Sequence, residues 1–161
     1  MPKGPAARLG DPTAHGSPLA GAPGCPTVLI GGQPAWRGTS AAAAANLAAQ
    51  AAAGAQKMAI AAAAATAGAA TPAGPALQAK LVETAISLVT EMASTMASMP
   101  GDLHACPIIK VLIPDGPGMV MNPSQTVLIG GMGAARLGDM IQEATAVSTV
   151  AMGCPTVIIG G

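Results

Sequence analysis

The sequence predicts a mainly β protein: a closed, pseudo-threefold β prism or cone made of three hairpin repeats, with an inserted α-helical hairpin. One seven-residue segment occurs three times almost unchanged: Pro-Thr-Val-Leu-Ile-Gly-Gly at 26–32, Gln-Thr-Val-Leu-Ile-Gly-Gly at 125–131 and Pro-Thr-Val-Ile-Ile-Gly-Gly at 155–161. An alanine-rich segment separates the first copy from the other two. A repeat retained in so short a chain indicates one supersecondary unit used three times.

Each copy is expected to form a strand and a tight turn. The apolar run suits a strand, and the Gly-Gly pair allows the positive φ angles that a tight hairpin turn needs. A second motif, Ala-Ala-Arg-Leu-Gly-Asp, occurs at 6–11 and 134–139, and Ala-Trp-Arg-Gly at 35–38 takes its place in the middle copy. The unit is therefore strand, glycine turn, strand, Gly-Asp and loop. We expect the aspartates to hydrogen-bond the turn that follows each glycine, and the arginines to face solvent or pair with them.

The two ends of the chain hold complementary halves of one unit. The chain begins with the second strand of a unit, at 5–11, and ends with the first strand of another, at 155–161. Pairing of these halves would close three units around an axis and leave no free sheet edge at the seam.

The inserted segment is predicted to be a helical hairpin. Residues 40–70 are mostly alanine, the best helix former, and Thr-Pro-Ala-Gly-Pro at 71–75 interrupts them. A second helix is expected over 77–99, where an apolar face recurs at steps of four and three residues. Its members are Leu81, Ala85, Leu88, Met92 and Met96. The sequence leaves open whether the hairpin packs on itself, on the prism or on another chain.

These features predict one domain with an insertion. Residues 1–39 form the first repeat, 40–100 the alanine-rich hairpin, and 101–161 the second and third repeats, which complete one domain with 1–39.

Composition limits the classes of function. The formal net charge is zero and only 9% of residues are charged, which argues against binding to nucleic acid or to an acidic membrane surface. With one Trp and no Phe or Tyr, the apolar core is expected to be small and to need further stabilisation by a bound metal or by a partner. No apolar run precedes the first unit, so we expect no secretory signal peptide. The three cysteines are then expected to be thiols or metal ligands.

The loops after the Gly-Asp pairs predict a metal site. The residues four positions beyond Asp11, Asp102 and Asp139 are His15, Cys106 and Glu143. Equivalent positions in a threefold fold converge near its axis, and all three residue types can bind zinc. The preferred ligand set for a structural zinc is His15, His104, Cys106 and Cys154. Glu143 and Cys25 remain alternatives for the fourth ligand.

No catalytic constellation stands out in the sequence. The Gly-Gly pairs lack the helix and lysine of a phosphate-binding loop, and a zinc held by four protein ligands has no open position for chemistry. We therefore expect a protein that is not an enzyme. One alternative is a small zinc hydrolase that uses His104 and Cys106. Another is a membrane-active or cargo-recruiting effector that acts through residues 40–100, although glycines and prolines interrupt this segment before it reaches the ~20 apolar residues of a membrane span.

The repeated motifs resemble the PAAR-repeat family. The resemblance rests on Pro5-Ala-Ala-Arg8 with Leu-Gly-Asp11, the Asp-x-x-x-His15 loop, the Gly-Cys-Pro-Thr-Val-Leu-Ile-Gly-Gly strand and the second Ala-Ala-Arg-Leu-Gly-Asp139. It covers residues 1–37 and 101–161. It implies a conical β protein with a zinc near its vertex. Such a cone sits on the blunt end of a trimeric VgrG-type spike in type VI secretion systems and related contractile injection machines.

The resemblance carries further expectations. The partner would be the spike, with an effector or chaperone possible at 40–100, and membrane contact would be transient, during puncture. The protein would be made in the cytoplasm and delivered outside the cell by the injection apparatus. His15 and the His104/Cys106 pair match the family's metal pattern. The chain departs from it at Glu143, where many members carry Cys, and near Asp115, where many carry His; Cys154 is the replacement that we expect.

A docking face is expected at the broad end of the cone. The turns at 31–32, 130–131 and 160–161 would lie there, next to the apolar residues Leu29, Leu128 and Ile158. We expect this glycine-rich, apolar face to contact the spike.

Overall fold

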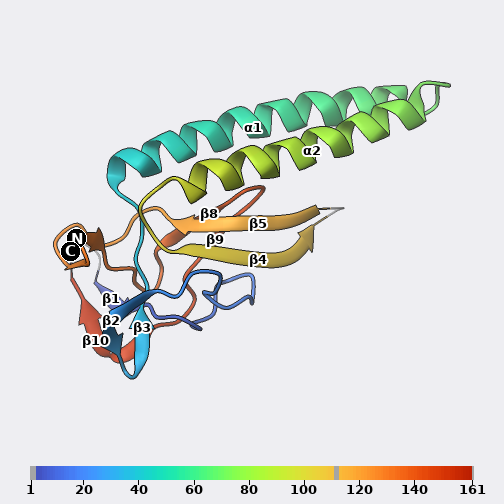
Figure 1. Cartoon of the computed structure of the whole chain (residues 1–161). Helices are drawn as coiled ribbons and strands as arrows, with labels where there is room; N and C mark the ends of the chain where they lie inside the picture. Colours follow the sequence, from blue (N-terminus) through green and yellow to red (C-terminus); the bar gives the residue numbers. More distant parts are fainter. Residues whose placement is uncertain (1–2, 111–112, 161) are drawn as a thin grey trace.

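The computed structural model describes residues 3–110 and 113–160. Its strands gather on one side of the molecule and two long helices lie over them (Figure 1). In chain order the elements are β1 (Gly4–Ala6), β2 (Cys25–Ile30), β3 (Gln33–Ala35), α1 (Ala41–Gly68), α2 (Gly74–Ala97), β4 (Leu103–Lys110), β5 (Ile113–Val120), β6 (Leu128–Ile129), β7 (Met132–Gly133), β8 (Met140–Glu143), β9 (Val147–Thr149) and β10 (Cys154–Ile159). The prediction of a mainly β protein is only partly right, because α1 has 28 residues and α2 has 24, about as many as the strands together.

Three short antiparallel pairs correspond to the three repeats. β2 pairs with β3, and β6 pairs with β7. Their turns use Gly31–Gly32 and Gly130–Gly131, all four at positive φ, as the sequence predicts. The third pair joins the ends of the chain, because β1 pairs with β10 and the two lie side by side (Figure 1). The predicted pairing of the two ends is confirmed.

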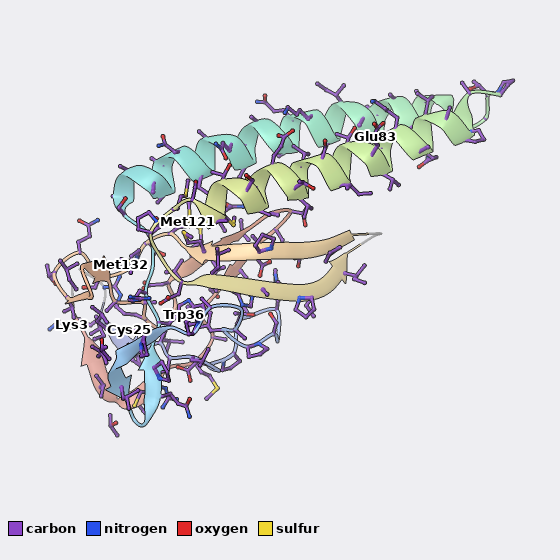
Figure 2. All side chains as sticks on the ribbon, viewed as in Figure 1. Lys3, Cys25, Trp36, Glu83, Met121 and Met132 are labelled. Atoms are coloured by element: carbon purple, nitrogen blue, oxygen red, sulfur yellow. The ribbon has the colours of Figure 1, made fainter. Side chains whose placement is uncertain are left out.

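A cyclic set of backbone hydrogen bonds ties the three repeats together. Ala7 N–H donates to the carbonyl of Ala135 at 2.9 Å, Ala135 N–H to that of Trp36 at 3.0 Å, and Trp36 N–H to that of Ala7 at 2.9 Å. Each unit thus donates to one neighbour and accepts from the other, which gives the strand region its pseudo-threefold symmetry. The side chain of Trp36 is fully buried and lies among the strands (Figure 2).

The same Arg–Asp contact occurs in each repeat. The pairs are Arg8–Asp11 at 2.8 Å, Arg37–Asp102 at 2.6 Å and Arg136–Asp139 at 3.1 Å. In each, the arginine backbone N–H donates to the carboxylate, at 2.8–2.9 Å. The predicted pairing of arginines with these aspartates is confirmed. In the middle copy, however, the two partners are 65 residues apart in sequence, and both helices lie between them.

The insert is a helical hairpin, as predicted, and it packs on the strands. Ser40 caps α1 by accepting a hydrogen bond from Ala43 N–H, and Pro75 stands in the first turn of α2, where a proline is tolerated. Buried Met92 and Met96 of α2 pack with Met119 and Met121 of the strand region. Figure 2 shows Met121 between the strands and the helices. This contact settles the packing that the sequence left open.

The hairpin runs alongside β4 and β5 and extends beyond their ends (Figure 1). The exposed pair Lys57–Glu91, at 3.6 Å, links α1 to α2. In the described part of the chain, no helix combines the length and apolar character that crossing a membrane requires.

The largest sheet is antiparallel, with the order β4-β5-β8-β9. In its register, Cys106 of β4 lies opposite Gly116 of β5, and Gly118 of β5 lies opposite both His104 of β4 and Glu143 of β8. The pairing therefore brings side chains of β4, β5 and β8 that could bind a metal into one region.

Candidate metal centre

Three segments of the chain build one polar cluster. The loop after β1 supplies His15, the β4–β5 pair supplies Cys106 and Asp115, and β8 ends on Glu143. Backbone contacts fix the loop against the sheet: Thr13 bridges to Val150 beyond β9, and Ala105 N–H of β4 donates to the carbonyl of Ala20. His15 is thus held over the sheet that carries the other three residues.

The potential ligand atoms of these four residues converge. One atom of each, taken from His15, Cys106, Asp115 and Glu143, lies within 4.8 Å of all the others. His15 Nδ1 is 2.9 Å from Glu143 Oε2 and 3.3 Å from Asp115 Oδ2. The side chains of Asp115 and Glu143 are fully buried, and Cys106 is 3% exposed.

The environment of Glu143 fits a cation. Within the described residues, neither carboxylate oxygen of Glu143 accepts a hydrogen bond of good geometry. Buried polar atoms are nearly always hydrogen-bonded, and a buried charge is paired or coordinates a metal. Two buried carboxylates, a thiol and an imidazole are together a donor set that a divalent cation can use. These four residues could therefore hold a metal ion.

Room for the Glu143 side chain comes from a glycine. A Cβ at Gly118 would lie 2.9 Å from Glu143 Cγ and equally close to a methyl group of Ile141. Because real Cβ atoms do not approach so closely, Gly118 is required for β5 to lie against β8 with Glu143 in this position.

Burial raises the pKa of both Glu143 and Cys106, but their neighbours shift the two groups differently. Burial alone would raise the pKa of the Glu143 carboxyl, but its contacts with His104 and His15 outweigh burial, and the pKa is lowered. Burial raises the pKa of the Cys106 thiol, and a hydrogen bond from Ser17 offsets this only in part. Without a metal, therefore, Glu143 favours its charged form and Cys106 favours its protonated form.

Comparison with known families gives a match in the C-terminal part of the chain. The family model of the PAAR motif matches residues 112–161, a range that runs from β5 to the end of the chain and includes Asp115 and Glu143. This part of the chain carries a PAAR motif. No curated protein and no solved structure gives a significant match. The family match agrees with the resemblance seen in the repeats, and a PAAR motif suggests a protein at the tip of a VgrG-type spike.

The structure brings together only part of the ligand set expected from the sequence. His15 and Cys106 lie in the cluster, together with Glu143, which was an alternative. His104 lies at its edge, with Nε2 3.6 Å from Glu143 Oε1 and 3.3 Å from Ser17 Oγ, and it is outside the group whose atoms all lie within 4.8 Å.

Cys154 lies elsewhere, in the apolar cluster of the three hairpins. Its neighbours there include Cys25, Ile30 and Ile159, and its Sγ is 3.2 Å from Thr156 Oγ1. The structure therefore does not bring Cys154 to His15, His104 and Cys106. Cys25, the other alternative, occupies the equivalent place at the start of β2, and Figure 2 shows it among the hairpin strands.

Asp115 belongs to the cluster but was not among the ligands expected from the sequence. It lies in β5, inside Ile-Pro-Asp-Gly-Pro-Gly, and its side chain reaches the site across the β4–β5 pair. The sequence feature that could have identified Asp115 as a ligand is a carboxylate within a strand, near the position where PAAR-repeat proteins often carry a histidine.

Proposed function

We propose that this protein is a structural tip that caps and sharpens a trimeric VgrG-type spike in a type VI secretion or related contractile injection system. The observation that most supports this proposal is the closed ring of three repeats, sealed by the β1–β10 pair, in a chain that carries the PAAR motif. A single chain with threefold character fits the end of a trimer. A sheet with paired ends also has no edge at its seam to peel under an axial load.

The three hairpins present a matching apolar face to such a partner. Leu29, Leu128 and Ile158 occupy equivalent positions next to the glycine turns, and their exposed fractions are 60%, 59% and 57%. Large apolar side chains that are exposed together at related positions are typical of an interaction surface. We propose that these three residues contact the three subunits of the spike.

The docking proposal predicts a large loss of affinity when this face is charged. Changing Leu29, Leu128 and Ile158 together to Asp should weaken binding to the cognate trimeric spike by more than about 100-fold, because three buried charges would lack partners. The measurement is biolayer interferometry with the purified spike. Val147→Asp is the matched control, since Val147 is 52% exposed and lies on β9, in a different sheet. Undiminished affinity of the triple variant would contradict the proposed docking face.

We further propose that a structural zinc is held by His15, Cys106, Asp115 and Glu143. Nitrogen, sulfur and oxygen donors from four side chains suit a tetrahedral zinc, and a site with four protein ligands is structural. Bound zinc would neutralise the buried acidic groups and tie the first-repeat loop to the β4-β5-β8 sheet. His15 would contribute its imidazole from the loop, and the other three would hold their positions through the strand pairing.

Metal binding is expected to be pH-dependent. The raised pKa of Cys106 keeps its thiol protonated in the metal-free protein, so coordination must release that proton. Zinc affinity should therefore rise about tenfold per pH unit between about pH 6.5 and pH 8. Competition with a chromophoric chelator measures this slope. An unchanged affinity over this range would show that Cys106 does not bind as thiolate, and Cys106→Ser serves as the reference for a site without it.

The domain organisation belongs to the same proposal. Residues 1–39 and 101–161 form the cone, and 40–100 are an insertion that is available to recruit an effector or a chaperone. An apolar groove of about 760 Å³ along α1 and α2, lined by alanines together with Met58, Leu81 and Leu88, supports a recruiting role. The protein would leave the cell with the spike, and no catalytic step is part of the proposal.

A further inference from the structure

A buried serine links three polar groups beside the candidate metal centre. Ser17 is 4% exposed. Its Oγ lies 3.5 Å from Cys106 Sγ, 3.3 Å from His104 Nε2 and 3.2 Å from Thr13 Oγ1. The ligation proposed above uses neither Ser17 nor His104, so this convergence needs its own explanation.

The three contacts of Ser17 can be given a consistent set of hydrogen-bond donors and acceptors. A hydroxyl has one proton and two lone pairs, and the geometry makes Ser17 the donor toward Cys106 Sγ. Its lone pairs then accept from Thr13 and from an N–H at His104 Nε2. In this arrangement the His104 proton lies on Nε2, the atom that also faces Glu143 Oε1 at 3.6 Å.

We propose that Ser17 and His104 form an outer layer that positions and tunes the metal ligands. This inference rests on the proposed metal site. Ser17 donates a hydrogen bond to the Cys106 thiolate, and His104 orients both Ser17 and the Glu143 carboxylate. Both are positioning residues: they touch ligands and do not touch the ion. A hydrogen bond to a bound thiolate draws electron density from the sulfur, and such outer contacts fix ligand orientation and tune the metal.

The position of His104 in β4 places it beside the proposed ligands. In β4, His104 and Cys106 are two residues apart and share one face of the strand. The loop residue Gly21 bridges to His104, and Ser17 from the same loop lies between the imidazole and the sulfur. The first-repeat loop thereby supplies both a ligand, His15, and the group that supports another ligand.

Cobalt(II) bound to the full chain provides the test, because a cobalt–thiolate bond gives a charge-transfer absorption that reports on the sulfur. Ser17→Ala should move this band to lower energy and weaken cobalt affinity by about 10-fold to 100-fold. Ser17→Thr, which keeps the hydroxyl, should restore the band position. Ser148→Ala is the matched control: Ser148 is also 4% exposed, its hydroxyl has no hydrogen-bond partner in the described residues, and its spectrum should equal that of the wild type.

The possible results separate this inference from the metal site itself. A Ser17→Ala protein with wild-type band and affinity would overturn the role of Ser17 and leave the metal site standing. Weaker affinity with an unshifted band, not rescued by threonine, would also overturn it, because the effect would be one of packing alone. A wild-type protein that binds no cobalt, or binds it without a thiolate band, would overturn the proposed ligation and this inference together.

Discussion

Glu143→Gln should remove most of the stabilisation that we expect zinc to give to the protein. Glu143 is fully buried and lies within 2.9 Å of His15, and among the described residues neither of its carboxylate oxygens accepts a hydrogen bond of good geometry. A ligand that binds only the folded state stabilises it by about 4 kcal/mol when its free concentration is 1,000 times the Kd. If the amide weakens binding by at least about 100-fold, this gain falls to about 1.4 kcal/mol or less at the same zinc concentration.

Chemical denaturation with and without buffered zinc measures both values. Glu83→Gln makes a suitable control, since Glu83 lies on α2 (Figure 2), far along the helical hairpin, with a side chain 70% exposed. It should keep the full zinc-dependent gain. A Glu143→Gln protein that zinc stabilises as much as the wild type would exclude Glu143 as a ligand.

Asp102→Ala should destabilise the fold by about 3–5 kcal/mol, because it leaves a largely buried charge without its partner. The carboxylate accepts two bonds from the Arg37 guanidinium, at 2.6 and 2.9 Å, and one from its backbone N–H. The side chains are only 15% and 3% exposed. The loss is large for a second reason: this contact closes the repeat into which the helices are inserted.

Urea denaturation of the metal-free protein measures this cost without interference from ligand binding. Glu83→Ala removes the carboxylate of the exposed Lys80–Glu83 pair, and it should cost less than about 1 kcal/mol. If Asp102→Ala costs no more than this surface change, the Arg37–Asp102 contact does not hold the interrupted repeat together.

Much of the fold is predictable because its signals are local or repeated. The Gly-Gly turns, the Arg and Asp positions and the breaks at Thr71–Pro75 each depend on neighbours in sequence. The pairing of the chain ends follows from counting half-units. The fold class is less predictable, because the repeats indicate a mainly β protein, whereas the 28 residues of α1 and the 24 of α2 are as extensive as the strands.

The candidate metal site is predictable from the sequence only where its residues recur in the repeat. His15, Cys106 and Glu143 share one spacing after Gly-Asp, and the structure brings them together. Asp115 depends instead on the β4–β5 register, which shifts between Cys106 and Ile109, and sequence spacing does not reveal such an irregularity. Cys154 has suitable ligand chemistry, but the repeats make it equivalent to Ser124. Ser124 lies at the hairpin end of the fold, where its hydroxyl donates to the carbonyl of Gly160.

The place where the helices enter has an architectural consequence. In the two uninterrupted repeats, the segment between arginine and aspartate is only Leu9-Gly10 or Leu137-Gly138, and both of these glycines are exposed with open space around them. The middle copy shows that a folded segment of some sixty residues fits between the arginine and the aspartate with their contact preserved. The turns at Leu9-Gly10 and Leu137-Gly138 therefore occupy equivalent exposed positions, at which we expect the scaffold to accept a further folded segment.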